Sequence, residues 1–242
     1  TAMHAASTMK TAVLLEALRR VDEGTLSLAG QVPIVDCFPS ALDGTPFQIE
    51  LEEQPDERIA PWVGKSARID FVAREMIVRS SNLATNVMLG LCPPKDVQRF
   101  VDALGAPSVK VRRMVADEKA YAAGFSNETD AEGMAALMEA AVRSPKLGPE
   151  ARRLAFEILA GQEWNEQIPA GLPKQAGAVV AHKTGSISKV QHDAAVVRLP
   201  DGREYVLVLL ATDFGANEEG RKRVVEATRK MSRAVWEAMI AP

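Results

Sequence analysis

Apolar residues recur every three or four positions in several segments of the chain, which is the spacing of one helix face. The clearest case is residues 11–24, where Val13, Leu14, Leu18 and Val21 share a face and Gly24 ends the segment. The same spacing predicts further helices over residues 67–79, 83–91, 94–104, 129–142, 149–160 and 218–240.

Two of these helices carry more detailed expectations. Thr129 and Glu132 have the spacing of a capping box, which would begin the helix over residues 129–142. The closing helix should turn one apolar stripe toward a sheet, formed by Val224, Ala227, Met231, Val235 and Ala238.

Apolar and β-branched runs near the C-terminus predict strands. They cover residues 178–186, 193–199 and 203–212, and Pro200-Asp201-Gly202 joins the last two as a hairpin. Residues 26–64 hold many prolines and a cluster of acidic residues, so we expect loop with short irregular strands there.

The order of these elements predicts an α+β fold, because a helical middle separates the first helix from an antiparallel hairpin sheet. We expect an α/β subdomain from residues 1–25 and 165–242, and a mostly helical subdomain from residues 26–164. Residues 106–127 have no clean period and form the long loop of this protein.

Composition and charge exclude several classes of function. Of 242 residues, 47% are hydrophobic, and 29 basic against 32 acidic residues give a net charge of −3, so neither nucleic acid nor an anionic membrane is generally attracted. The longest strongly apolar run, residues 205–211, is too short to span a membrane. Cys37 and Cys92 fit no metal spacing; a disulfide and two buried free thiols both remain open.

Ser7 and Lys10 lie one turn apart at the start of the first predicted helix, so they share a face. A serine attacks well only when a base takes its proton, and a lysine is such a base once burial or nearby cations lower its pKa. Free N–H groups at a helix start also point toward an oxyanion formed at Ser7. Alone, the pair is better explained as an N-cap serine and a solvated lysine.

Two further stretches carry candidate chemistry. Ser80-Ser81-Asn82 interrupts two predicted helices, where side chains point into a cleft or simply cap the second helix. Residues 182–186, His-Lys-Thr-Gly-Ser, end the first predicted strand. Strand alternation puts Lys183 and Gly185 on one side, and a glycine there lets a substrate approach the backbone closely. Alone, this stretch also fits an exposed strand end.

Together the three motifs are far more specific than any one of them. S-x-x-K, then S-x-N about seventy residues later, then K-T-G about a hundred further on, is the ordered set of class A β-lactamases and penicillin-binding proteins. The chain therefore resembles the class A β-lactamase-like serine hydrolases of the penicillin-recognising superfamily, over nearly its whole length. The resemblance implies the β-lactamase/transpeptidase-like fold, an antiparallel sheet flanked by helices plus an all-α subdomain.

The resemblance also implies catalytic roles. Ser7 is similar to the acylated nucleophile and Lys10 to its proton acceptor. Ser80 resembles the hydroxyl that relays a proton to the leaving nitrogen, and Lys183 the group that sets the electrostatics around it. The oxyanion hole of such enzymes is two backbone N–H groups, here those of Ser7 and Ser186.

Substrate-binding roles follow from the same resemblance. Asn82 is similar to the amide that binds the substrate side-chain carbonyl. Thr184 and Ser186 would hydrogen-bond the substrate carboxylate, beside Gly185. His192 falls near the place of a carboxylate-binding arginine in many class A enzymes; a substrate-orienting role and a strand-to-strand hydrogen bond are equally open.

Three departures from the family pattern matter. Ser81 replaces the usual structural aspartate of the second motif, so we expect a local rewiring. Aligning the long loop on Arg113 places Val115 where class A enzymes carry the glutamate that activates the deacylating water, with Asp117 and Glu118 close but out of register. Family β-lactamases have two strands before the nucleophile helix and this chain has at most the end of one, so an absent segment or a partner chain should cover the sheet edge.

The sequence leaves three hypotheses of function. The first is a serine β-lactamase or related amide hydrolase with slow deacylation. The second is a D,D-peptidase or esterase on the same residues, and the third is a sensor that is acylated and stays so. The family needs no metal and no cofactor, and the spacing of His4, His182 and His192 matches no familiar zinc pattern. The partner is a small-molecule substrate, and the expected location is periplasmic or secreted.

Overall fold

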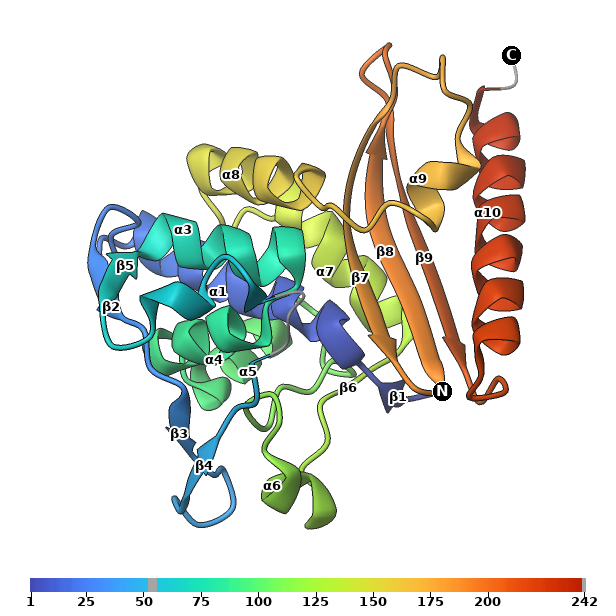
Figure 1. Cartoon of the computed structure of the whole chain (residues 1–242). Helices are drawn as coiled ribbons and strands as arrows, with labels where there is room; N and C mark the ends of the chain where they lie inside the picture. The colour runs from blue at the N-terminus through green and yellow to red at the C-terminus, as the bar shows by residue number, and fades with distance from the viewer. Residues whose placement is uncertain (52–55, 241–242) are drawn as a thin grey trace.

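A three-stranded antiparallel sheet with helices on both faces organises the chain (Figure 1). The computed structural model describes residues 1–51 and 56–240. The sheet has the order β7-β8-β9, formed by Val179–Ile187, Val190–Arg198 and Glu204–Thr212. This mixed architecture confirms the predicted α+β, β-lactamase/transpeptidase-like fold.

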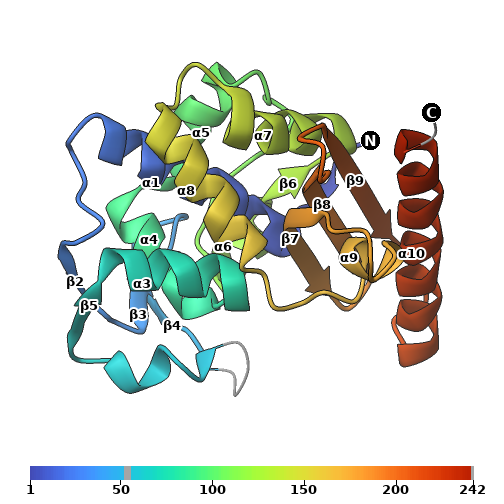
Figure 2. The same cartoon turned by 90° about the horizontal axis from the view of Figure 1, so that it is seen from above.

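The two faces of the sheet are covered by different parts of the chain (Figure 2). One face packs against α9 (Ile168–Gly171) and the long closing helix α10 (Glu218–Ile240). The other face packs against the 3-10 turn η1 (Ala6–Met9), α7 (Ala131–Arg143) and α8 (Pro149–Ala160). The sheet therefore separates a small apolar cluster under α10 from the main core.

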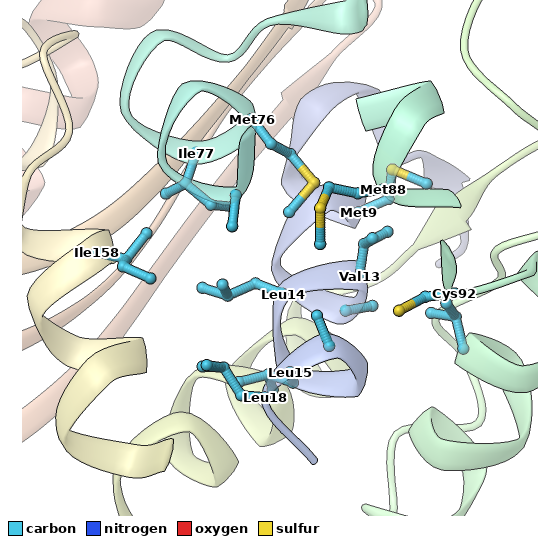
Figure 3. Close-up of a cluster of buried hydrophobic side chains, with 14 of the residues drawn as sticks. Met9, Val13, Leu14, Leu15, Leu18, Met76, Ile77, Met88, Cys92 and Ile158 are labelled. Carbon is cyan, nitrogen blue, oxygen red and sulfur yellow. The ribbon is translucent and has the colours of Figure 1, made fainter. Parts of the chain in front are cut away.

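Helix α1 (Lys10–Asp22) is the centre of the main core. All nine residues from Lys10 to Leu18 are buried, because other helices surround this half of α1. Its neighbours are α4 (Asn82–Leu91), α5 (Pro94–Ala103), α7, α8 and the π-helical turn η3 (Glu75–Arg79). Figure 3 shows Leu14, Met76 and Met88 meeting in this cluster. The predicted helix over residues 67–79 is α3 (Ile69–Arg74) continued by η3.

The remaining elements are short, and their strands form separate two-stranded pairs. Residues 26–64 hold the short strands expected there, and the long loop contains one helical turn. They are β2 (Gln31–Pro33) with β5 (Ser66–Arg68), β3 (Cys37–Pro39) with β4 (Pro46–Gln48), η2 (Ala60–Trp62), α6 (Glu118–Ala122), and β1 (Met3–His4) with β6 (Glu128–Thr129). The N-terminal strand thus joins β6 and not the main sheet.

Two local predictions were wrong. Asp130, not Thr129, caps α7, because its carboxylate accepts from Gly133 N at 2.8 Å. The second sheet strand begins at Val190, three residues before the expected Asp193, since the whole of β8 pairs with both neighbours.

The sheet-facing stripe of α10 also differs from the prediction. Thr228, Ser232 and Trp236 are buried, whereas Met231 is 47% exposed; Ala227 and Ala238 are exposed as well, and only Val224 and Val235 are half-buried. The physical reason is close packing on α9: Ser232 donates to Ile168 O at 2.8 Å, and a Cβ on Gly171 would lie 2.5 Å from Ser232 Cβ. A small side chain is needed at Ser232, so the buried face of α10 is centred on Thr228, Ser232 and Trp236 and not on the predicted stripe.

The expected covering of the sheet edge concerns strand β9. Among the described strands, β9 pairs on one side only, with β8, so the covering of its outer edge stays a prediction.

Cys37 is exposed and Cys92 is buried, and both are free thiols. No described helix combines the length and apolarity that crossing a membrane requires.

Candidate active site

A cleft of about 1050 Å³ lies beside strand β7, the first turn of α10 and the helical layer. Residues of all three predicted motifs line it: Ser7, Ser80, Asn82, Thr184 and Ser186. The two motif lysines, Lys10 and Lys183, are fully buried behind this surface. The fold thus brings together residues that are far apart in the sequence.

Ser7 lies in the 3-10 turn η1 that leads into α1. Ala6, at the start of the turn, has a φ of 46°, which is costly for a residue with a Cβ. Thr8 fixes the turn from inside, since its N–H and its hydroxyl both donate to Ala5 O, at 3.2 and 2.6 Å. Ser7 is therefore held half-buried at the cleft, one turn before the buried amine of Lys10.

The Ser80 hydroxyl lies between two lysine nitrogens. Lys183 Nζ is 3.0 Å and Lys10 Nζ is 3.3 Å from Ser80 Oγ. Ser80 reaches this position because η3 ends there in a left-handed conformation, with φ 65° and ψ 29°. Lys10 also donates to Ser80 O at 2.6 Å and to Asn82 Oδ1 at 2.9 Å. A proton at the hydroxyl or at either amine therefore has a neighbour that can receive it.

Burial sets the electrostatics of the lysine pair. Desolvation, reinforced by the charge of Lys10, holds the pKa of Lys183 well below its usual range, and Asp193 offsets this only in part. Two ammonium groups this close disfavour one another in a buried site. The close pair of lysines therefore favours a state in which one of the two amines is neutral. A neutral amine can accept a proton from a hydroxyl.

The departure at Ser81 is compensated from another part of the chain. Ser81 Oγ donates to the carboxylate of Asp56, which also accepts from Leu83 N at 3.3 Å. Ser81 Oγ in turn accepts from Ala84 N at 2.9 Å and caps α4. The expected rewiring at Ser81 is therefore a hydroxyl paired with a carboxylate 25 residues earlier.

Gly185 has a different role from the one its position predicts. A Cβ at Gly185 would lie 3.1 Å from Ser7 N and 3.0 Å from Thr8 N. The close approach is therefore that of the Ser7 turn onto β7, and not that of a substrate onto Gly185. A side chain at this position would push the turn, and Ser7 with it, away from the strand.

Arg221 is a cleft residue that sequence reasoning missed. It lies in the first turn of α10 and donates from Nη2 to Ser186 Oγ at 2.7 Å. Ser186 Oγ donates onward to Gln191 Oε1 at 2.9 Å. Arg221 and Thr184 both line the cleft at this end, so a cation and a hydroxyl face the same space. No motif surrounds Arg221 in the sequence, because only the packing of α10 brings it to β7.

Both ring nitrogens of His192 are hydrogen-bonded to backbone atoms, so neither is available to a substrate. The ring is fully buried; Nδ1 accepts from Ala211 N at 3.2 Å, so Nε2 carries the proton and donates to His4 O at 3.0 Å. Burial lowers the pKa of His192, which favours this neutral form. Of the two interpretations left open, the strand-to-strand hydrogen bond is the observed one, and His192 does not belong to the substrate wall.

His182 and His4 are likewise placed by local contacts. His182, the residue before Lys183 in β7, is buried, 2.8 Å from Asp193 Oδ1 and 3.1 Å from Asn165 Oδ1. His4 lines the cleft with its ring edge-on to Tyr121, and burial together with Arg113 lowers the pKa of His4. Over residues 1–51 and 56–240, no group of three or more His, Cys, Asp or Glu side chains is arranged to hold a metal ion.

Val115 lies at the cleft with its backbone fixed. Asn86 accepts from Val115 N at 2.8 Å and donates to Val115 O at 2.9 Å. Asp117 points elsewhere: it is fully buried and accepts from Ser40 Oγ, Ala41 N and Ala120 N at 2.7 to 3.1 Å. Glu118, in contrast, is exposed and lines the cleft. Of the two nearby carboxylates, only Glu118 therefore faces the space around Ser7.

Comparisons with known proteins point to one family and one fold. The model of the beta-lactamase enzyme family matches residues 1–239. A search of curated proteins finds no match. Among solved structures, PBP-A is 26% identical with a TM-score of 0.79, and the match covers 99% of this chain and 82% of that one.

Two further structures are similar over the same span. A point mutant of PBP-A, in an acyl-enzyme complex with penicillin G, is 27% identical with a TM-score of 0.78, covering 99% of this chain and 82% of that one. A beta-lactamase from Burkholderia vietnamiensis is 22% identical with a TM-score of 0.82, covering 100% and 85%.

Proposed function

The chain belongs to the beta-lactamase enzyme family, and on that premise we propose that it is a serine hydrolase that forms an acyl-enzyme on Ser7. Family membership makes it a hydrolase of the β-lactamase kind. The observation that carries the finer proposal is the Ser80 hydroxyl, 3.0 and 3.3 Å from two buried lysine nitrogens at the cleft that Ser7 lines.

Acylation is a transfer between three neighbouring groups. Ser7 Oγ bonds to the carbonyl carbon of the substrate as its proton passes to Lys10. The C–N bond of the amide breaks, and the leaving nitrogen takes a proton from Ser80, which regains one from the lysines beside it. The backbone N–H groups of Ser7 and Ser186 stabilise the oxyanion.

A substrate with a carboxylate and an amide carbonyl suits the walls of the cleft. Arg221 and Thr184 supply a charge and a hydroxyl for the carboxylate, and the Ser186 hydroxyl adds a second donor when it turns from Gln191 to the substrate. Asn82 has its Oδ1 engaged by Lys10, so its amide nitrogen is the group offered to a carbonyl. β-Lactams and acyl-D-Ala peptides both have these features.

Deacylation is the slow step of the proposal. Water must bond to the ester carbon and release Ser7 with a proton, and Val115 cannot take the water's proton. Of the two carboxylates that follow Val115 closely in the sequence, Glu118 lines the cleft and Asp117 is occupied as the cap of α6. Glu166 and Glu218 also line the cleft. The β-lactam ester on Ser7 should therefore form quickly and then be lost by slow hydrolysis.

The second candidate is a D,D-peptidase or esterase-like penicillin-binding enzyme, or an acylated sensor. Val115 favours it, because such proteins tolerate the absence of a deacylating carboxylate. The similarity to PBP-A, a mutant of which forms an acyl-enzyme with penicillin G, supports the same candidate. A periplasmic or secreted location stays a prediction under either candidate.

Intact mass spectrometry with penicillin G tests the proposal. The wild-type chain should gain the mass of one penicillin, and Ser7→Ala should gain none. Ser188→Ala is the matched control, since Ser188 lines the same cleft outside the motifs and should leave the adduct unchanged.

The outcomes of this experiment distinguish between the candidate functions. A wild-type chain without an adduct contradicts every penicillin-recognising candidate, and an adduct on Ser7→Ala contradicts the nucleophile. A transient adduct supports the β-lactamase, whereas a persistent one supports the D,D-peptidase or the sensor.

A further inference from the structure

Asp56 is a buried carboxylate that none of the catalytic steps above uses. It is fully buried, and its Oδ1 accepts from Ser81 Oγ and from Leu83 N. Its Oδ2 is buried too and takes no hydrogen bond from the described residues. Because burying a carboxylate is costly, its retention at this position calls for a local reason.

The partner of Asp56 is the residue between two cleft side chains. Ser81 follows Ser80 and precedes Asn82, and both of these line the cleft. The Ser81 hydroxyl accepts from Ala84 N, so its single proton is free to go to Asp56. Ser81 N donates to Glu75 O at 3.0 Å, and Ser81 O accepts from Thr85 Oγ1 at 2.6 Å. Asp56 is the charged member of this set.

The turn that Asp56 holds is under strain. Ser80 is left-handed, with a φ of 65°, which a residue with a Cβ adopts only when its surroundings demand it. The same turn contacts Lys10 through Ser80 O, Ser81 O and Asn82 Oδ1. Any relaxation at Ser81 therefore moves the groups that bind Lys10 and the hydroxyl beside Lys183 at once.

The position of the charge adds to the effect. Ser81 is the N-cap of α4, and an anion is favoured at a helix N-terminus, where N–H groups such as that of Leu83 lack helical partners. The carboxylate thus stabilises the start of α4 in the orientation that points Ser80 and Asn82 at the cleft.

We propose that Asp56 is a positioning residue that fixes the strained Ser80–Asn82 turn and thereby sets the hydrogen-bond distances of Ser80 Oγ and Lys10. It touches no reacting atom and acts through Ser81. The inference rests on the proposed function for its kinetic consequence, because Ser80 and Lys10 are the proton-transfer groups of acylation.

A variant series with a matched control tests this role. Asp56→Ala removes the carboxylate, and Asp56→Asn keeps an oxygen for Ser81 without the charge. Asp130→Ala is the control, because Asp130 also caps a helix and accepts from a serine, Ser108 Oγ at 2.7 Å. The double exchange Asp56→Ser with Ser81→Asp returns one carboxylate and one hydroxyl to the same pair in reversed order.

Two measurements follow on each variant. The first is the second-order rate constant for penicillin G acylation, corrected for the folded fraction. Misplacing catalytic groups by about 1 Å costs on the order of 10²-fold, so we expect that loss for Asp56→Ala, a smaller one for Asp56→Asn and wild-type rates for Asp130→Ala. The double exchange should recover most of the loss. The second measurement is the NMR resonance of the Lys10 side chain in ligand-free protein, which should shift in Asp56→Ala and not in Asp130→Ala.

The two measurements separate failure of the inference from failure of the function. If the folded Asp56→Ala protein acylates like wild type and its Lys10 resonance is unmoved, Asp56 does not position the turn. If wild type itself is not acylated, the proposed function fails, and the Lys10 resonance alone decides the inference. A double exchange that rescues thermal stability but neither acylation nor the Lys10 resonance would reduce Asp56 to a stabilising residue.

Discussion

Replacing Val115 by glutamate should turn a long-lived acyl-enzyme into a short-lived one. Val115 lines the same cleft as Ser7, and Asn86 fixes its backbone through two hydrogen bonds of 2.8 and 2.9 Å. A new side chain at this position is therefore presented at the cleft by a rigid main chain. Valine has no atom that accepts a proton, whereas a carboxylate there takes one from a water beside the ester.

The size of the effect follows from the chemistry of the step. General-base assistance is worth about 10²–10⁴ in rate, or roughly 3–5 kcal/mol of activation free energy. We expect the lower end, about 10²-fold, because only the backbone of residue 115 is fixed in advance. In stopped-flow kinetics with a chromogenic cephalosporin, wild type should show a stoichiometric burst and slow turnover. Val115→Glu should speed the slow phase and leave the burst rate unchanged.

Val115→Gln is the control, since it matches glutamate in shape and lacks its basicity. Equal acceleration by both variants would show that space, and not proton acceptance, limits deacylation. Fast wild-type turnover without a burst, undiminished by Glu118→Gln and Asp117→Asn, would mean that another group activates the water and that the reasoning about this loop is wrong.

Four further predictions can be checked separately. Lys183→Ala should slow acylation by anionic β-lactams far more than by neutral esters, because a bound carboxylate favours the ammonium form that burial disfavours; equal losses in kcat/KM would count against this. Arg221→Ala should raise KM for carboxylate-bearing substrates and spare neutral esters in steady-state assays, and a uniform loss would argue against a carboxylate site. His192 has a pKa lowered by burial, so below about pH 6.5 the unfolded chain binds a proton that the folded one refuses, and the free energy of unfolding should decrease as the pH is lowered. His192→Gln should flatten that decrease in urea titrations, and an unchanged slope would exclude His192 as its source. The outer edge of β9 should pair with another strand, so a chain of these residues should self-associate in light scattering, and a stable monomer would contradict this.

The long regular elements could be predicted because each carries its own local pattern. Helices α8 and α10 begin and end at the expected residues, and the three sheet strands differ from the prediction only at their ends. The two-residue strands β1 and β6 could not be found, since they are about 125 residues apart and exist only because tertiary packing brings them together. The buried face of α10 escapes prediction for a similar reason: Ser232 faces α9, where only small side chains fit.

The candidate site likewise contains residues that the sequence predicts and residues that only the fold reveals. Motif order was enough to bring Ser7, Ser80 and Lys183 to one place, although no single motif was convincing. Arg221 and Asp56 were missed because their partners, Ser186 and Ser81, are set by the fold alone. Asp56 belongs to a run of acidic residues that is typical of a solvated loop, and nothing in the sequence distinguishes Asp56 as a carboxylate that is fully buried.

The candidate site lies at two turns, at Ser7 and at Ser80, where regular secondary structure is interrupted. Helix α1 connects the two turns. Ala6, beside Ser7, has a φ of 46°, and Ser80 itself has a φ of 65°. Left-handed backbone at such residues costs about 1–3 kcal/mol each, so it persists only where surrounding contacts enforce it. Helix α1 supplies those contacts, because its buried first half follows directly from the Ser7 turn and its Lys10 holds the Ser80 turn through Ser80 O. If Ser80 relaxed to a helical φ, its hydroxyl would leave the neighbourhood of the two lysines, and if Ala6 did so, Ser7 would move from its place at the cleft. The strain and the chemistry therefore have the same structural cause, which is why periodicity locates the elements of this fold while only motif spacing locates its site.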